Sequence, residues 1–210
     1  MARVVPSSPS LTWQAGLFAS SDSPQIDPAF STLGRVELDT RSWIDVAPAW
    51  VSGSDALFEQ LLTTVAWEGL DRVMYGNVVQ QPRLSARLVG SVELPALEAA
   101  RVALSGRYGV EFDSIGLNLY RDGSDSVAWH GDRIPKEIVD PIVALVSLGH
   151  PRRFLLRPKG GGKSCAFDLG RGDLLVTGGA CQREWQHSVP KVASAGPRIS
   201  IAFRHSTRYS

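Results

Sequence analysis

The stretch Arg198-Ile199-Ser200-Ile201-Ala202-Phe203-Arg204 alternates strictly between apolar side chains and polar or small ones. Successive side chains of a strand point to opposite faces, so this alternation predicts a β-strand with one face against a core. The two arginines would share the other face, separated only by Ser200 and Ala202. Such a face either borders a cavity rimmed by guanidinium groups or forms a solvent-exposed edge.

A second stretch, Ile115-Gly116-Leu117-Asn118-Leu119-Tyr120, alternates in the same way. Asn118 and Tyr120 would share the polar face, where they either line the same cavity as the arginines or pair with buried polar groups. From Ile115 onward, short apolar runs alternate with turn residues. The sequence therefore predicts a mainly β fold with flanking helices (α+β), whose core is an antiparallel barrel or jelly roll.

The flanking helices are predicted at residues 54–67 and 94–108, where apolar residues recur at helical spacing. Ser54 could cap the first helix, and Gly109 lies near the end of the second. We expect residues 1–34, which are rich in Ser and Pro, to form a partly ordered N-terminal arm. Residues 35–114 would provide helical support and a substrate lid, and 115–210 the catalytic core, with 35–210 forming one structural domain.

Two histidines and an aspartate predict a metal site. His130 and Asp132 are separated by one residue, and His187 lies in a distant segment, Trp185-Gln186-His187. On an extended chain, residues i and i+2 share a face, so a third ligand from another strand can complete the facial triad that binds Fe(II) in oxygenases. The alternative is a surface His-Asp pair with an unrelated histidine. Two nearby arginines favour the metal site, because their planar guanidinium groups suit a dicarboxylate cosubstrate.

The chain resembles the AlkB family of Fe(II)/2-oxoglutarate dioxygenases. The resemblance follows the family's order through residues 118–132, 141–149, 152–154, 157, 172–176, 182–191 and 196–204. It implies a double-stranded β-helix (jelly-roll) core backed by N-terminal helices. It also implies Fe(II), 2-oxoglutarate and O2 as cofactor and cosubstrates, with His130, Asp132 and His187 as iron ligands. The implied 2-oxoglutarate contacts are Asn118, Tyr120, Arg198 and Arg204, together with Ser200, which stands where the family often has asparagine.

The resemblance implies oxidative dealkylation of N-alkylated bases in nucleic acid, with DNA favoured over RNA. Expected substrate contacts are two lid aromatics, Trp67 and Tyr75, and four basic residues, Arg87, Arg152, Arg157 and Lys159. Two departures from the family leave the substrate open: Arg87 and Leu88 replace lid aromatics, and Ile134 replaces an acidic residue. The same chemistry on RNA, protein or a small molecule is one alternative, and a non-catalytic nucleic-acid-binding module is another.

Charge is distributed unevenly along the chain. Residues 1–150 contain 11 Lys and Arg against 18 Asp and Glu, a charge of −7, whereas residues 151–210 contain 11 against 3, a charge of +8. A basic region around the site would attract polyanions. Cys165 and Cys181 are expected to be free thiols. The apparent lack of a signal peptide or apolar span predicts a cytoplasmic protein without a membrane partner; no protein partner is implied.

Overall fold

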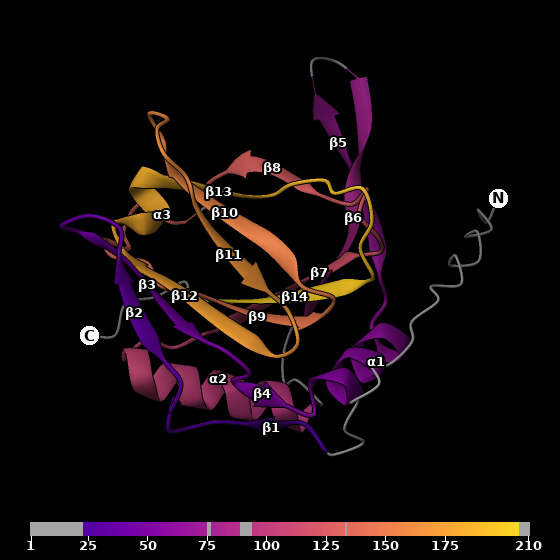
Figure 1. Ribbon diagram of the computed structural model, residues 1–210, viewed down its shortest axis with the longest axis horizontal. Coiled ribbons are helices and arrows are strands. Elements are labelled where there is room, and N and C mark those ends of the chain that lie inside the picture. Colours follow the sequence, from indigo (N-terminus) through magenta and orange to yellow (C-terminus); the bar gives the residue numbers. More distant parts are fainter. Residues whose placement is uncertain (1–22, 75–76, 89–93, 133, 206–210) are drawn as a thin grey trace.

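The computed structural model describes residues 23–74, 77–88, 94–132 and 134–205. Its strands and helices, labelled in Figure 1, follow the order β1 (Gln25–Ile26), β2 (Gly34–Glu37), β3 (Ser42–Ala47), β4 (Val51–Ser52), α1 (Ser54–Thr64), β5 (Glu68–Met74), β6 (Asn77–Leu88), α2 (Pro95–Tyr108), β7 (Ser114–Tyr120), β8 (Val127–His130), β9 (Val143–Gly149), β10 (Arg152–Pro158), β11 (Cys165–Leu169), β12 (Asp173–Gly179), α3 (Cys181–Glu184), β13 (Trp185–Val189) and β14 (Arg198–Arg204).

Two antiparallel sheets form the body of the molecule. The large sheet has the order β2-β3-β12-β9-β14-β7-β6-β5, and the small sheet has the order β11-β10-β13-β8. From β7 onward each strand switches to the other sheet, except that β10 and β11 form a hairpin within the small sheet; this is the arrangement of a jelly roll. The predicted fold class is therefore confirmed. Among the described residues, no helix is long and apolar enough to cross a bilayer.

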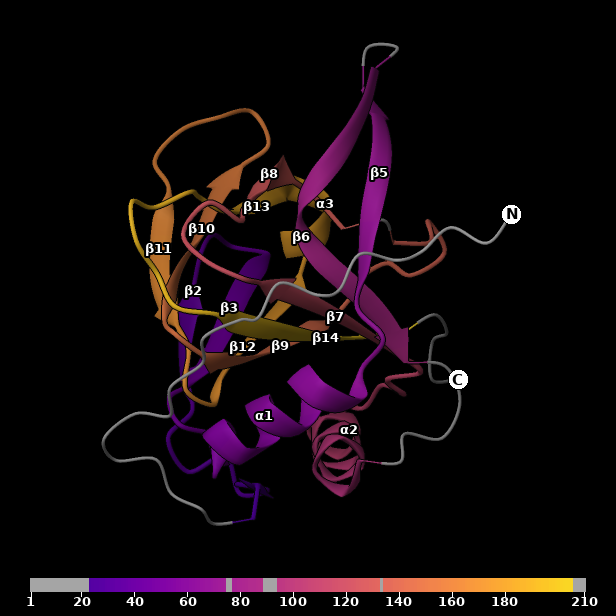
Figure 2. The ribbon, with the colours of Figure 1, turned by 90° about the vertical axis from the view of Figure 1, so that its right-hand side faces the viewer.

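One hydrophobic core lies between the helices and the large sheet (Figure 2). Leu57 and Leu61 of α1 and Leu104 of α2 are buried in it together with Ile199 and Ile201 of β14. A second core, which includes Phe154, Leu156 and Tyr120, lies between the two sheets. Because alternate residues of β14 face these two layers, its apolar side faces the helices and its arginine side faces the space between the sheets.

Both predicted helices are present in the structure, but their ends and the first N-cap differ from the prediction. The first helix ends at Thr64 rather than near Trp67, and its N-cap is Gly53, with no side-chain capping bond, so Ser54 is not the cap. The second helix begins at Pro95 and is closed by Gly109. Gly109 has φ 63, a left-handed conformation that glycine adopts without a steric penalty.

Residues 34–88 also contribute strands that the sequence analysis did not predict. The expected lid is a hairpin of β5 and β6 that rises beyond the sandwich, and β6 pairs with β7 inside the large sheet. Within residues 23–34, Phe30 is buried and stacks on Trp50 with ring centroids 5.4 Å apart. This part of the N-terminal segment therefore packs against the domain.

Candidate metal and cosubstrate site

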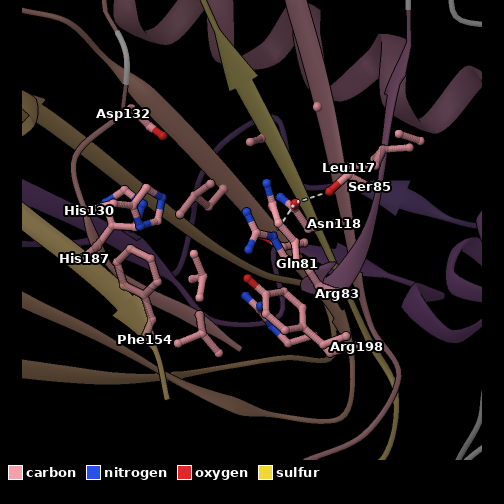
Figure 3. A pocket seen from close by; sticks show the side chains of 18 of the residues that line it. Gln81, Arg83, Ser85, Leu117, Asn118, His130, Asp132, Phe154, His187 and Arg198 are labelled. Carbon is pink, nitrogen blue, oxygen red and sulfur yellow. Dashed lines mark hydrogen bonds between the residues drawn. The ribbon is translucent and has the colours of Figure 1, made fainter. Parts of the chain in front are cut away.

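A cavity of about 320 Å³ opens between the two sheets (Figure 3). The large sheet contributes side chains from β6, β7, β9 and β14, and the small sheet contributes side chains from β8, β10 and β13. The predicted triad lies at one end of this cavity. The cavity also contains every predicted 2-oxoglutarate contact: Asn118, Tyr120, Arg198, Ser200 and Arg204.

Strand pairing brings the triad together. His130 is the last residue of β8, and His187 is its antiparallel partner on β13. Asp132 follows in the loop after β8, so the turn rather than strand alternation aims its carboxylate. One ligand atom from each of the three residues lies within 4.8 Å of the others, close enough to bind one ion. The His130 Nδ1–H donates to the Ala128 carbonyl at 2.9 Å, which leaves Nε2 as the free ligand atom.

The local charges favour the protonation states that a metal requires. Burial lowers the pKa of His187 to about 4, so its imidazole is neutral at pH 7. Burial by itself would raise the pKa of Asp132, but the Arg204 guanidinium and the two histidines outweigh it and lower this pKa. The neutral imidazole of His187 and the ionised carboxylate of Asp132 can bind a divalent cation without first losing protons. The residues therefore fit Fe(II).

Arg198 lies at the other end of the cavity and is almost completely buried. Its Nη2 donates to Ser147 Oγ at 2.6 Å, but Nε and Nη1 have no hydrogen-bond partner among the described residues. Burial lowers the pKa of Arg198, because it disfavours the charged form. A buried guanidinium with unused donors requires an anion. A carboxylate of 2-oxoglutarate fits this requirement.

Arg204 marks the metal end of the same strand face. Its Nη2 lies 3.1 Å from Asp132 Oδ1, so it contacts the carboxylate ligand directly. Gly116 leaves room for it, because a Cβ at that position would lie 3.3 Å from Arg204 Nη1. Arg198 and Arg204 therefore have different surroundings: one has unused donors for a ligand, and the other is paired with the triad.

Two polar residues of β6, Arg83 and Ser85, also line the cavity, and the sequence analysis missed them. Both hydrogen-bond to Asn118. A signal was present, because polar residues alternate with Leu84 and Ala86 along this segment. The expectation of helices and a lid within residues 35–114 did not include this strand of the cavity wall.

Arg152 does not have the role that we predicted. Its side chain is buried, and its Nη atoms donate to the backbone carbonyls of Asp122, Asp125 and Pro190 at 2.8–2.9 Å. These bonds hold three loops together and leave the guanidinium out of reach of a phosphate. Arg152 and Arg198 are buried and Arg204 is paired with Asp132, so these three arginines do not contribute to an exposed basic patch.

The other expected substrate contacts lie in different places. Arg157 packs over the Trp129 ring at 4.2 Å, and neither residue lines the cavity. Lys159 is exposed beside the turn that carries the triad, within 3.7 Å of the space a side chain at Gly131 would take. Arg87 is exposed and donates to Ser114 Oγ at 3.1 Å.

Of the two expected lid aromatics, Trp67 is the one that the described residues include. Trp67 packs against the core under the helices, and its buried Nε1 has no partner among the described residues. This placement agrees with a packing role. Tyr75 lies outside the described residues. Cys165 and Cys181 are free, as expected, and burial raises the pKa of the Cys181 thiol to about 12.

Comparison with known proteins identifies the family. Alpha-ketoglutarate-dependent dioxygenase alkB homolog 3 of Bos taurus is 34% identical over 175 residues, which cover 72% of this chain and 61% of that protein. The DNA oxidative demethylase ALKBH2 of Arabidopsis thaliana is 37% identical over 120 residues, which cover 46% of this chain and 38% of that protein. The chain thus spans about three fifths of the bovine relative's length.

A solved structure, OsALKBH1, has the same fold, with a TM-score of 0.58 and 15% identity over 82% of this chain and 100% of that one. The family model described as the 2OG-Fe(II) oxygenase superfamily matches residues 57–204, which is most of the chain. The match agrees with the triad geometry and with the expected resemblance. The chain belongs to the 2OG-Fe(II) oxygenase superfamily as an AlkB-like member, in a family that uses Fe(II), 2-oxoglutarate and O2.

Proposed function

We propose that this protein catalyses Fe(II)- and 2-oxoglutarate-dependent oxidative dealkylation of N-alkylated bases in nucleic acid. One observation carries the proposal: a single cavity joins a metal triad to a buried arginine with unused donors. A non-catalytic binding module would have no use for either feature. The names of the relatives, a dioxygenase and a DNA oxidative demethylase, support the same chemistry.

The residues of the cavity have distinct tasks in this reaction. His130, Asp132 and His187 would hold Fe(II), and Arg198 would hold a carboxylate of 2-oxoglutarate. Asn118 and Ser200 lie between these two ends in the register of the sheet. When bound, Fe(II) would activate O2, so that one oxygen atom enters succinate as CO2 leaves and the other hydroxylates the alkyl carbon. Arg198 would fix one charged end of the cosubstrate and thereby set its direction in the cavity.

The hydroxylated product then breaks down without further oxidation. Its C–N bond breaks, the alkyl carbon leaves as an aldehyde, and the hydroxyl proton returns to the base nitrogen through solvent. For a methyl group, the balance is one O2 and one 2-oxoglutarate consumed for one succinate, one CO2 and one formaldehyde formed. The protein must therefore present the alkyl carbon at the open side of the triad.

DNA is the proposed substrate, and a base in a duplex must be flipped out of the stack to enter the cavity. The β5–β6 hairpin, whose strand β6 lines the cavity and which rises beyond the sandwich in Figures 1 and 2, is the proposed lid. Lys159, exposed beside the triad turn, and Arg87, exposed on β6, are the remaining candidates for phosphate or base contacts. The name of the Arabidopsis relative supports DNA over RNA.

A substrate panel tests the proposal. Single- and double-stranded DNA and RNA oligonucleotides with defined N-methylated bases would be incubated with Fe(II), 2-oxoglutarate and O2, and mass spectrometry would measure the loss of 14 Da per methyl group. Asp132→Ala is the inactive control, because it removes a triad ligand. We expect demethylation of at least one DNA substrate. Activity on RNA alone, or on none of the oligonucleotides despite succinate formation, would contradict a DNA substrate.

A further inference from the structure

The side-chain amide of Asn118 is held from one side by two residues of β6. Arg83 Nε donates to Asn118 Oδ1 at 3.0 Å, and Ser85 Oγ donates to the same oxygen at 3.1 Å (Figure 3). Ser85 is also the antiparallel partner of Asn118 in the register of β6 and β7. The oxygen side of the amide therefore faces β6.

The chemistry of arginine determines this orientation. A guanidinium has only donors, so the atom of Asn118 that it contacts must be the oxygen. The Nδ2 group is then left on the side away from β6. On that side, β14 places Ser200 opposite Asn118, and both residues line the cavity. Asn118 therefore presents two N–H donors to a ligand lying between the triad and Arg198.

Without these bonds, the amide could rotate by 180° about its last torsion and present its oxygen to the cavity. An oxygen there would repel a carboxylate or a keto oxygen, whereas an NH2 group would donate to either. Arg83 is itself oriented by a second, longer bond from Nη1 to the Ser126 carbonyl, at 3.5 Å. The strand that forms the proposed lid thus also determines the polarity of the cavity wall.

We infer that Arg83 and Ser85 are positioning residues for 2-oxoglutarate, which they act on through Asn118 by fixing its amide with the NH2 group toward the cavity. The inference rests on 2-oxoglutarate being the cosubstrate, as proposed above, and is independent of the nucleic-acid substrate. According to this inference, β6 forms part of the wall of the 2-oxoglutarate site in addition to being part of the proposed lid.

The test measures binding rather than turnover. Isothermal titration would give the Kd for 2-oxoglutarate of protein loaded with Mn(II) under anaerobic conditions, where no oxidation occurs. Arg83→Met should weaken binding about ten-fold, the size expected for one lost hydrogen bond to a charged ligand. Arg83→Lys should recover most of the affinity, because an ammonium is also a donor-only group. Ser85→Ala should give a smaller loss.

A double-mutant cycle separates positioning from direct contact. In an Asn118→Ala background, Arg83→Met should cause no further loss of affinity, because the residue that it orients is gone. Arg153→Met is the matched control: this arginine is exposed, lies on β10 and pairs with Asp168 at 3.6 Å, so its loss should leave the Kd unchanged. Thermal melting would verify that each variant folds, and Ser85→Ala provides a test that removes only one oxygen atom.

Two results would overturn the inference. One is an unchanged Kd in both Arg83→Met and Ser85→Ala. The other is a full additional loss from Arg83→Met in the Asn118→Ala background, which would mean that Arg83 contacts the ligand itself. A wild-type protein that binds Mn(II) but no 2-oxoglutarate would give a different pattern, because it would contradict the proposed function and the inference together.

Discussion

Arg152 and Arg198 are two buried arginines in different regions of one sandwich, and their surroundings differ. Arg152 lies at a junction of loops, where its Nη atoms donate to three backbone carbonyls. Arg198 lies at the end of the cavity, where one Nη atom donates to a serine and two nitrogens have no described partner. Both guanidinium groups lie within 6 Å of the Tyr120 ring centroid.

This difference separates a structural cation from a binding site. Removing a guanidinium from water is costly unless its donors are satisfied. The Nη groups of Arg152 are satisfied within the protein, so its hydrogen bonds stabilise the fold. Arg198 Nε and Nη1 have no partner among the described residues, so their hydrogen bonds are available to a ligand. The predictions below test this contrast.

The largest expected effect is the loss of 2-oxoglutarate binding in Arg198→Met. Leaving a carboxylate in the cavity without its buried partner should cost about 3–5 kcal/mol, or more than a hundred-fold in Kd. The free energy of unfolding should stay the same or increase, because an unpaired buried charge has been removed. Titration of the Mn(II) protein and urea denaturation would measure the two quantities. An unchanged Kd for 2-oxoglutarate in Arg198→Met would contradict the binding role of Arg198.

The reverse result is expected for Arg152→Met. Three backbone carbonyls would lose their donor, at roughly 1 kcal/mol each, so the free energy of unfolding should fall by about 3 kcal/mol. At a temperature where the variant is folded, its Kd for 2-oxoglutarate should stay within a few-fold of the wild-type value. A stable Arg152→Met variant with weakened 2-oxoglutarate binding would contradict this prediction, because it would give Arg152 the binding role and not the structural one.

His187, at the metal end of the cavity, should make the free energy of unfolding depend on pH. The pKa of His187 is lowered to about 4 in the folded protein, so the unfolded chain binds its proton first as the pH falls below about 6.5. The metal-free protein should therefore lose stability between about pH 6.5 and 4, by at most about 3 kcal/mol. His187→Asn removes this titration. Urea midpoints of both proteins in the presence of a chelator would be compared at several pH values, and parallel curves would contradict the prediction.

The smallest expected effect concerns the exposed cations. Each phosphate contact contributes about 0.7–0.9 to the slope of log affinity against log salt. Lys159→Ala should therefore weaken oligonucleotide binding and flatten its salt dependence by about one such contact. Arg153→Ala is the matched control, because Arg153 is an exposed arginine of β10, the strand that precedes Lys159. Equal slopes in wild type and Lys159→Ala would remove Lys159 from the nucleic-acid interface.

The strand faces could be predicted from the sequence because alternation depends on local chemistry alone. The predicted faces of residues 115–120 and 198–204 agree with the structure, and the three triad residues meet as expected. Alternation does not indicate, however, which strands pair with one another. The pairing of β6 with β7, and hence the contacts of Arg83 and Ser85 with Asn118, depends on long-range register.

Arg152 shows a second limit. An arginine that binds backbone carbonyls and an arginine that binds phosphate look the same in sequence, and only the three loops that meet around Arg152 distinguish them. The N-cap of α1 is another position at which the residue type alone did not determine the role. Ser54 has the right chemistry for a cap, but the chain enters the helix through Gly53 in a left-handed conformation.

The most direct test of the account is the stoichiometry of a single reaction. Succinate, formaldehyde and restored base would be counted together for a methylated DNA oligonucleotide, with wild-type protein and with Asp132→Ala as the inactive control. The account predicts equal amounts of all three products from the wild type and none above background from the variant. Succinate formed in the wild type without formaldehyde or base repair would contradict it.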